Sequence, residues 1–388
     1  MKEKVFIVEA LRTPVGDVNK GLKNWTAPEL GAEIVSEFKR RYPILEKHTD
    51  SVLIGNNVSA GIGQNPARQT AILGGIPVEV NSFTLNQVCG SGLAAVCLAE
   101  KLVKCQEQKL IISGGIESTS HMPYIIKRNQ AKEDITRDML IDSLQNDGLN
   151  CAFENAPMGL AAEHLASRLQ ITREEQDQFA VESHNKAIKA AQEGAFKTEI
   201  IPFKDGEQEI RLDEKPRENT SIKRLSRLKP VFKEEGTITA GNASGLGDAA
   251  ALLLLTSEKG LKEYNLNPLA TIIDSLSIGF APLETFFGLS KAIEIILERN
   301  NLSLGDIDLF EICESFASVV LGTIKSLSID KNKVNIYGGD VALGHPLGAS
   351  GVRILVTLIH ALKNSQKRRG VAVIAMGGGH TTAVLVEI

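Results

Sequence analysis

The sequence predicts an α/β protein built from two related halves, with a segment of different character inserted between them. A glycine-rich turn that opens a helix occurs twice, at residues 89–92 and again at residues 344–351. A short apolar strand that runs into consecutive glycines also occurs twice, at residues 110–113 and 371–376. Between these repeats, residues 119–245 are rich in charged residues and do not continue the sheet pattern. The repeated pattern indicates a duplicated unit, and the charged stretch indicates an insertion.

Apolar periodicity predicts the individual elements in chain order. Strands are expected at Val5–Glu9, Val52–Gly55, Thr84–Val88, Leu110–Ser113, Leu309–Cys313 and Val371–Met376. Helices are expected at residues 28–41, from Ala67, at Ala94–Lys104 and from the turn at residues 344–351. Thr172 to Glu175 has the pattern of a capping box and predicts a helix start inside the insert. The seven apolar residues of Ala249–Leu255 are expected to be buried.

These elements divide the chain into three parts. We expect an N-terminal half at residues 1–118 plus 249–268, an insert at residues 119–248 and a C-terminal half at residues 269–388. A chain of 388 residues is too long for one simple core, so more than one packed unit is expected.

Composition and charge exclude several classes of protein. Hydrophobic residues make up 43% and charged residues 23% of the chain, which is ordinary for a globular protein. A net charge of −4 gives no electrostatic signal for nucleic acid or for an anionic membrane, so we expect neither as a partner.

Cysteine usage and the apolar runs point to a reducing compartment. The five cysteines include no C-x-x-C pair, which argues against a disulfide framework and a metal site. No signal peptide is visible at residues 1–4, and no apolar run approaches the ~20 residues of a membrane span. We therefore expect a cytoplasmic protein without a metal.

Cys89 is the first candidate for chemistry. It stands where a strand is expected to end and a helix to begin, and the free N–H groups and partial positive charge of a helix start favour a thiolate. The thiolate is the nucleophilic form of cysteine. A small buried cysteine in a tight turn is the alternative interpretation. Cys97 and Cys105 follow on the same expected helix and are interpreted as packing residues.

His345 is the second candidate. It lies in a glycine-rich loop before a helix, and histidine is the side chain best suited to take a proton near neutral pH. The other histidines have no such setting. A third segment, Thr239–Gly245, is made of small residues that would let backbone approach a ligand, although a plain tight turn explains it equally well.

Taken together, these segments resemble the thiolase family. The resemblance spans residues 5 to 386 and rests on the order and spacing of nine motifs: Arg12-Thr13-Pro14, Gly63 to Gln69, Asn86 to Gly92, Gly114 to Ser118, Met158-Gly159, Thr237 to Gly245, Glu314 to Ala317, Gly344 to Gly351 and Gly377 to Gly379. It implies two similar five-layered α/β/α/β/α halves and an inserted loop domain that binds coenzyme A. It also implies a homodimer or homotetramer.

The resemblance assigns roles to particular residues. It implies that Cys89 takes the acyl group from a thioester, that His345 activates Cys89, and that the backbone amides of Cys89 and Gly377 form an oxyanion hole. Acyl-CoA thioesters are then substrates, and no other cofactor is expected. The positions that match coenzyme A contacts are Met158, Arg217, Phe232, Ala240, Ala243, Ser244 and Phe316.

Several positions depart from the family pattern. Ala375 stands where the family has its second cysteine. In the family, that cysteine is the base that removes the α-proton of the second acetyl-CoA. Cys313 replaces the asparagine of the Asn-Glu-Ala-Phe motif. Pro157 replaces the usual histidine before Met-Gly, and the glycine run continues as His380-Thr381.

Cys313 is a candidate replacement base. Sterol-carrier-type thiolases also lack the second cysteine and carry a cysteine in the same motif, but at the position of Ser315 here. The alternative is that Cys313 reflects drift in a site that no longer performs the Claisen step.

The leading hypothesis is a CoA-dependent C-acyltransferase of thiolase type that works through a Cys89 thioester and has a reduced or altered Claisen step. One alternative keeps only the first half-reaction and passes the acyl group to water or another acceptor. Another is a non-catalytic acyl-CoA-binding subunit. Retention of Cys89, His345 and both glycine runs argues against the last.

Overall fold

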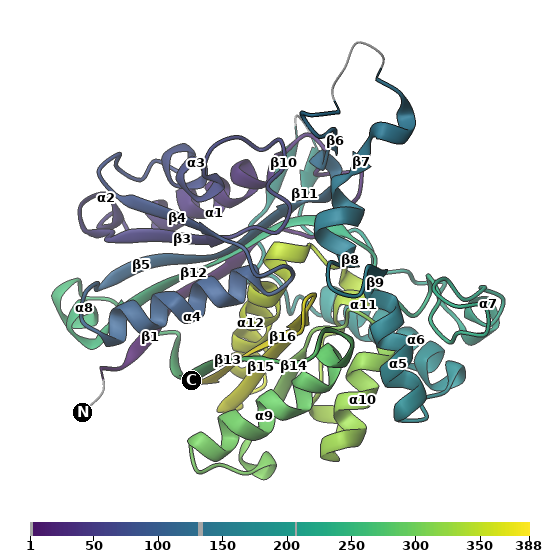
Figure 1. The fold of residues 1–388 in the computed structure, drawn as a ribbon. Coiled ribbons are helices and arrows are strands. Elements are labelled where there is room, and N and C mark those ends of the chain that lie inside the picture. Colours follow the sequence, from purple (N-terminus) through teal and green to yellow (C-terminus); the bar gives the residue numbers. More distant parts are fainter. Residues whose placement is uncertain (1–2, 131–134, 206–207) are drawn as a thin grey trace.

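A ten-stranded sheet organises the computed structural model, which describes residues 3–130, 135–205 and 208–388 (Figure 1). Along this sheet the strands are β14 (Leu309–Ile312), β15 (Arg369–Met376), β16 (His380–Glu387), β13 (Ala270–Gly279), β1 (Val5–Arg12), β12 (Gly247–Ser257), β5 (Leu110–Ser118), β3 (Ser51–Gly55) and β4 (Asn81–Leu85). The short strand β2 (Gly16–Asp17) pairs with β12.

The two sides of this sheet repeat one topology, and they meet where β1 pairs antiparallel with β13. Outward from that junction, β12, β5, β3 and β4 follow β1, and β16, β15 and β14 follow β13 in the same relative sequence order. On both sides the last strand in sequence runs antiparallel to its neighbours, whereas the outer strands are parallel. Val334 makes a single parallel bridge to Phe310 at the place that corresponds to β4. The predicted duplication is therefore confirmed.

Helices complete the five layers (Figure 1). The outer face of the N-terminal strands is covered by α1 (Ala27–Arg41) and α3 (Pro66–Leu73). The outer face of the C-terminal strands is covered by α9 (Gly288–Arg299) and α10 (Ala317–Leu327). Between the two groups of strands, α4 (Ser91–Lys104) packs against α12 (Leu347–Asn364). Every residue of α12 from Leu347 to Leu362 is buried, as expected of a helix that is covered on all sides.

The segment between β5 and β12 is mostly helices and short hairpins. Its helices are α5 (Met158–Arg168), α6 (Arg173–Gln192) and α7 (Ile222–Leu225), and its paired strands are β6 (Tyr124–Ile125) with β7 (Ile141–Asp142), β8 (Asn150–Cys151) with β9 (Ala156–Pro157), and β10 (Phe203–Asp205) with β11 (Gln208–Ile210). The predicted capping box is present: the hydroxyl of Thr172 accepts the Glu175 amide, and the Glu175 carboxylate accepts the Thr172 amide. Three short helices lie elsewhere: α2 (Leu45–His48), α8 (Glu258–Glu263) and α11 (Asp340–Leu343).

Arg12 ties this segment to the sheet. Its fully buried guanidinium donates to Glu199 at 2.6 Å and to both carboxylate oxygens of Asp213 at 2.6 and 2.9 Å. These two carboxylates raise the pKa of Arg12 although burial opposes its charge.

Three expected strand ends are wrong by three residues or more. The strand expected at Val5–Glu9 continues as β1 to Arg12. The other two differ for local reasons. The strand expected at Thr84–Val88 ends at Leu85, because Val88 takes a left-handed backbone with φ of 50° and turns the chain. The strand expected at Leu110–Ser113 continues as β5 to Ser118. A Cβ at Gly115 would lie 2.1 Å from the Gly348 carbonyl oxygen, so this glycine allows close packing against α12 instead of ending the strand.

Within the described ranges, no helix combines the length and the apolar character that crossing a bilayer requires.

Candidate active site

A cavity of about 440 Å³ brings together most of the residues predicted for the site. Its lining includes Cys89, Met158, Phe232, Ala243, Ser244, Phe316, His345 and Gly377. These residues come from segments up to 288 positions apart in the chain, so the fold assembles what the motifs suggested. Arg217 and Ala240 do not line this cavity, and neither does Cys313.

Cys89 stands on a strained turn before α4. Val88, the preceding residue, has φ of 50°, a conformation that is rare for a β-branched side chain and costs free energy. The turn is held on both sides: the Asn86 side chain accepts the Val88 amide at 2.9 Å, and the Ser91 hydroxyl donates to the Val88 carbonyl at 2.6 Å. Cys89 is half-buried and lines the cavity, so its thiol is accessible to a ligand.

His345 lies between α11 and α12. Its amide donates to the Gly245 carbonyl oxygen at 2.8 Å, which fixes the loop against the segment that leads into β12. Gly344 has φ of 102°, so the approach to His345 needs a glycine. The residue is only 4% exposed, yet it lines the cavity.

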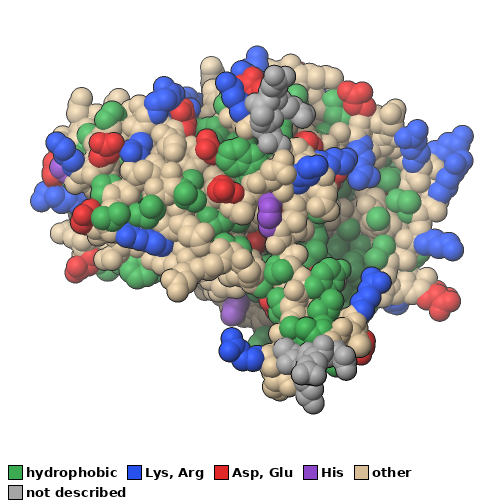
Figure 2. Space-filling model, turned by 90° about the horizontal axis from the view of Figure 1, so that it is seen from above, with side chains coloured by type: hydrophobic (Ala, Val, Ile, Leu, Met, Phe, Trp, Pro, Cys, Tyr) green, Lys and Arg blue, Asp and Glu red, His purple; other side chains and the backbone are tan. Residues whose placement is uncertain are grey.

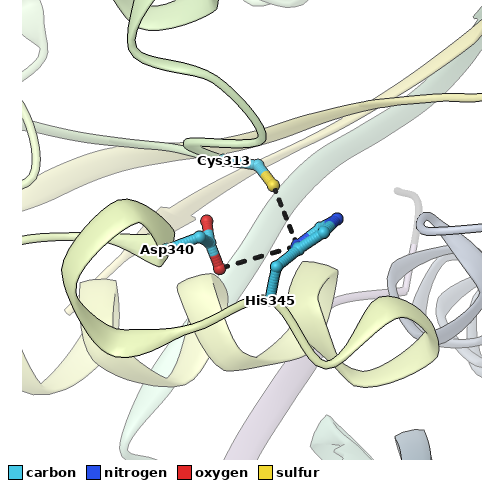
Figure 3. A group of neighbouring side chains, drawn as sticks. All are labelled: Cys313, Asp340 and His345. Atoms are coloured by element: carbon cyan, nitrogen blue, oxygen red, sulfur yellow. Dashed lines mark hydrogen bonds and ion pairs between the residues drawn. The ribbon is translucent and has the colours of Figure 1, made fainter. Parts of the chain in front are cut away.

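Behind the imidazole lies a buried group that consists of Cys313, Asp340 and His345 (Figure 3). The Nδ1 atom of His345 is 3.8 Å from the Cys313 sulfur and 3.8 Å from Oδ1 of Asp340. In Figure 3 the other ring nitrogen points away from both partners. Cys313 also lies 3.7 Å from the Ser315 hydroxyl, and Ser315 does line the cavity.

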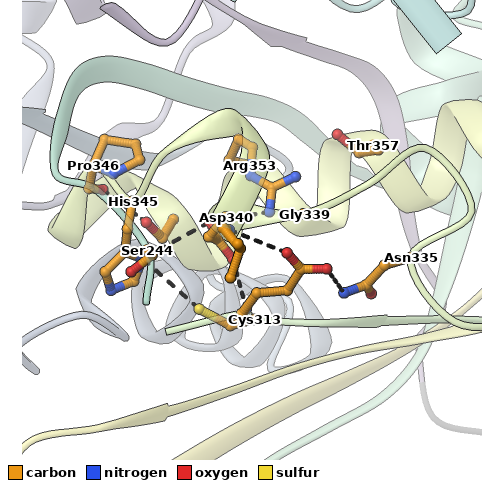
Figure 4. A network of polar contacts seen from close by, with 12 residues as sticks. Ser244, Cys313, Asn335, Gly339, Asp340, His345, Pro346, Arg353 and Thr357 are labelled. Carbon is orange, nitrogen blue, oxygen red and sulfur yellow. Dashed lines mark hydrogen bonds and ion pairs between the residues drawn. The ribbon is translucent and has the colours of Figure 1, made fainter. Parts of the chain in front are cut away.

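Asp340 is held as a carboxylate. Arg353 donates to its Oδ1 at 3.1 Å and the Glu314 amide donates to its Oδ2 at 2.8 Å (Figure 4). Burial favours the neutral acid, but Arg353 and His345 outweigh it and hold the pKa of Asp340 far below its usual value. Asp340 is also the first residue of α11, where a negative charge is favoured.

The charges of the other two members follow. Burial and the Asp340 carboxylate raise the pKa of Cys313 to about 11, so Cys313 is a neutral thiol at neutral pH. Burial would lower the pKa of His345, but interactions with Cys313, Asp340 and Cys89 raise it well above its ordinary value. Cys313 has the largest of these upward effects on the pKa of His345, but only as a thiolate. Because its own pKa is about 11, Cys313 is a neutral thiol at neutral pH, which leaves Asp340 as the anion that favours the imidazolium.

The same three side chains have the donor types of a metal site, and their atoms lie within 4.8 Å of one another. Both oxygens of Asp340 already accept hydrogen bonds, from Arg353 and from the Glu314 amide. A guanidinium 3.1 Å from one of the oxygens opposes a bound cation. The group therefore fits a hydrogen-bonded arrangement better than a metal centre.

The ends of β14 and β15 form the part of the cavity that departs from the family pattern. Ala375, Met376 and Gly377 line it at the end of β15, and Ser315 and Phe316 line it after β14. Among the lining residues, all of which are described, Cys89 and His345 are the only ones with titratable side chains. His380, which follows the glycine run, begins β16, is exposed and lies outside the cavity lining.

Aromatic rings form an apolar part of the cavity. Phe316 packs edge-on against Phe232, with ring centroids 5.8 Å apart, and against Phe286 at 5.9 Å. A Cβ at Gly159 would lie 2.2 Å from the Phe232 ring, so the Met158-Gly159 pair packs directly against this ring. Pro157, at the position of the missing histidine, lines the same region.

A second, smaller cavity of about 50 Å³ adjoins the first. Arg217 and Ala240 line it, and Ala243 lines both cavities. The short helix α7 lies between β5 and β12, as Arg217 does, and carries the exposed residues Lys223 and Arg224. Figure 2 shows lysine and arginine side chains gathered at the end of the molecule where Figure 1 places α7.

Comparison with known proteins decides the family. Residues 5–259 match the family described as "Thiolase, N-terminal domain", and residues 266–388 match "Thiolase, C-terminal domain". The chain belongs to the thiolase family. It is therefore an acyltransferase, and the fold expected from the family resemblance is confirmed.

Individual thiolase relatives match along their full length. The chain is 40% identical over 396 residues to a "Probable acetyl-CoA acyltransferase" of Staphylococcus aureus strain COL and to the protein of the same name in strain N315, with 99% of each chain covered. The crystal structure of the Bacillus anthracis acetyl-CoA acetyltransferase matches with a TM-score of 0.95 and 36% identity, over 100% of this chain and 99% of that one.

Sequence reasoning missed the residues that support this thiolase site from behind. Asp340 and Arg353 flank the Gly-His-Pro motif, but a carboxylate in a short helix and an arginine in a long one carry no distinctive pattern. Glu117 was part of a recognised motif without a role. It accepts hydrogen bonds from the Gly348 and Asn57 amides and so anchors the start of α12 beside His345, and burial raises its pKa to about 7.

Proposed function

We propose that the chain is a thiolase-type acetyl-CoA acyltransferase in which the Cys89 thiol accepts the acyl group from a CoA thioester. The observation that supports this most directly is the pairing of Cys89, on its strained turn, with His345 in one cavity. An activated cysteine beside a histidine is the arrangement that nucleophilic acyl transfer needs. The names of the relatives support acetyl-CoA as a substrate.

The proposed first half-reaction uses groups that line this cavity. The Cys89 thiolate attacks the thioester carbonyl, a tetrahedral oxyanion forms, and its collapse expels the CoA thiolate. That thiolate takes up the proton of the His345 imidazolium, while the acyl group stays on Cys89. The backbone amides of Cys89 and Gly377 are proposed as the donors to that oxyanion. The imidazolium of His345 faces the same space.

We further propose that the carbon–carbon step is reduced, and that Cys313 supports what remains of it. Support comes from Ala375, which lines the cavity but cannot take a proton. Cys313 lies outside the lining, so it would act through its contacts with His345 and Ser315. Because its pKa is raised to about 11, its thiolate would be a strong base that is rarely populated.

The segment between β5 and β12 is proposed to hold coenzyme A. The two cavities share Ala243, which provides a route from Cys89 toward Arg217 and Ala240. A guanidinium suits the nucleotide phosphates or the face of the adenine ring. Lys223 and Arg224 on α7 add positive charge close by in the sequence.

We also propose that the chain forms a homodimer or homotetramer through the sheet edge at β4. This strand has no partner on its outer side among the described strands, and both Phe83 on the strand and Val78 just before it are exposed. Burying such an edge against a second copy removes unpaired backbone groups and apolar surface from water. Light scattering at several protein concentrations tests this proposal.

Ala375 also favours a second candidate, an enzyme that performs only the acyl transfer to Cys89 and then releases the group to water or another acceptor. One experiment separates the candidates. The protein is incubated with acetyl-CoA, analysed by peptide mass spectrometry, and assayed for acetoacetyl-CoA. An acetyl adduct on Cys89 with product formation supports the thiolase reaction, and an adduct without product supports the second candidate. No adduct indicates a non-catalytic acyl-CoA-binding subunit.

A further inference from the structure

The Nδ1 side of His345 is enclosed by protein. Cys313 and Asp340 both lie 3.8 Å from this nitrogen, and both are buried. The second ring nitrogen points away from them, on a side chain that lines the cavity with Cys89 (Figure 3). The second ring nitrogen is therefore the one available to Cys89 and a substrate, whereas the protonation of Nδ1 depends on its buried neighbours Cys313 and Asp340.

Contacts from several elements fix the position of the Asp340 carboxylate beside Nδ1 of His345. Arg353 from α12 and His345 from the loop between α11 and α12 meet at its carboxylate (Figure 4). The Glu314 amide, from the segment after β14, donates to the same carboxylate. The separation of 3.8 Å from Nδ1 exceeds a hydrogen bond, but an opposite charge within about 4–6 Å still favours the charged form of its partner. Cys313, a neutral thiol, does not compete with Asp340 for this role.

We propose that Asp340 is a positioning residue that keeps a proton on Nδ1 of His345 and holds the ring as an imidazolium, so that Cys89 is a thiolate before substrate arrives. The inference rests on the proposed function of Cys89 as acyl acceptor. The proton that leaves the Cys89 sulfur resides on the cavity-facing nitrogen of His345, and no other group changes charge. Because Ala375 cannot ionise, Cys89 and His345 are the titratable groups that line the cavity, and Asp340 sets the protonation state of both.

A purely structural role is the competing explanation, because Asp340 also fixes Arg353 and the Glu314 amide. The two explanations differ in pH dependence. Asp340 favours the charged form of His345, so its removal makes the imidazolium give up its proton at lower pH. A thiolate that depends on this imidazolium then forms only at higher pH. A structural role lowers stability without moving the pH profile.

The test is the pH dependence of Cys89 alkylation by iodoacetamide, followed on the Cys89 peptide by mass spectrometry between pH 5 and 10. Buried Cys313 is read out separately on its own peptide. The chain is compared with Asp340→Asn and with the smaller uncharged Asp340→Ser. Glu311→Gln is the matched control, since Glu311 is equally buried and interacts with Arg353 but makes no hydrogen bond or ion pair with His345 within the described residues.

The unsubstituted chain is expected to be alkylated at pH 6 at close to its plateau rate, whereas an ordinary cysteine ionises near pH ~8.5. Both Asp340 variants are expected to react at least about tenfold more slowly at pH 6, with their profiles displaced upward by about one pH unit or more. Glu311→Gln is expected to keep the original profile.

Two outcomes would overturn the proposal. One is a profile in the unsubstituted chain that rises only near pH 8.5, a result that needs no variant to fold. The other is an unchanged profile in a folded Asp340 variant. Acetyl transfer from acetyl-CoA is measured separately at pH 9. Loss of that transfer in the unsubstituted chain would count against the proposed function and leave the alkylation result to decide the role of Asp340.

Discussion

The two sides of the cavity differ in what their residues can do. The nucleophile side, Cys89 and His345, pairs a thiol on a strained turn with an imidazole backed by the ionised Asp340. The β14–β15 side, Ser315 and Ala375, contributes no titratable side chain to the cavity, and its Cys313 is buried behind His345. Acyl transfer to Cys89 needs only the first side, whereas removal of an α-proton needs a base from the second. Under the proposed function, this comparison implies that the two half-reactions can be lost independently.

The largest expected effect is removal of the nucleophile. Cys89→Ala should abolish the acetyl adduct and lower turnover on the order of 10⁴-fold or more, because no other thiol lines the cavity. Peptide mass spectrometry after incubation with acetyl-CoA checks this, with Cys97→Ala as the control. Equal labelling of the Cys89→Ala protein would show that Cys89 is not the acyl acceptor, and the nucleophile side of the comparison would be wrong.

Restoring a thiol on the other side should have the next largest effect. Ala375→Cys should raise acetoacetyl-CoA thiolysis by about 10²–10⁴-fold, the usual contribution of a positioned general base. Acylation of Cys89 should stay the same. Ala375→Ser, which is similar in size but has no thiol, should stay at the low rate. A rise in Ala375→Ser equal to that in Ala375→Cys would show that side-chain volume, and not a base, limits the step.

Removing Cys313 tests whether the β14–β15 side still supplies a base. Cys313→Ala should lower the residual thiolysis by about 10²-fold, at the lower end of general-base effects, while acylation continues. Stopped-flow acylation and steady-state thiolysis on the same preparation provide the measurement. Thiolysis that survives the substitution unchanged would assign the residual base to another residue.

The smallest expected effect lies outside both sides. Arg217→Ala should weaken coenzyme A binding by about tenfold through loss of a charge-assisted contact. Acylation at saturating substrate should be unchanged. Arg211→Ala is the matched control, because Arg211 is exposed and paired with Glu209 elsewhere on the surface. Calorimetric titration with coenzyme A checks this, and equal affinities in the two variants would contradict the proposed route of the nucleotide.

The sequence predicted the duplicated fold because strand, glycine and helix patterns repeat at both ends of the chain. The resemblance to thiolases also predicted eight residues that line one cavity, and all of them except Phe232 lie within the nine motifs. Asp340 could not be predicted in this way. Its effect on His345 depends on α11, α12 and the end of β14 meeting in space, and that meeting leaves no local pattern.

The turn before Cys89 shows the same limit in the backbone. Val88 is β-branched and favours an extended strand, so the local preference predicted a strand up to Cys89. The Asn86 side chain accepts the Val88 amide and the Ser91 hydroxyl donates to the Val88 carbonyl, and these two hydrogen bonds overrule that preference. The strain is concentrated at the residue next to the nucleophile, where local propensity is least reliable.

The central claim is that acyl transfer is intact while the carbon–carbon step is impaired. It is tested most directly by measuring single-turnover acylation of Cys89 by acetyl-CoA beside acetoacetyl-CoA thiolysis, in the unsubstituted chain and in Ala375→Cys. The account predicts acylation that is at least about 10²-fold faster than thiolysis in the unsubstituted chain, and a much smaller gap in Ala375→Cys. Equal rates for both steps in the unsubstituted chain, with thiolysis unaffected by Cys313→Ala, would contradict it.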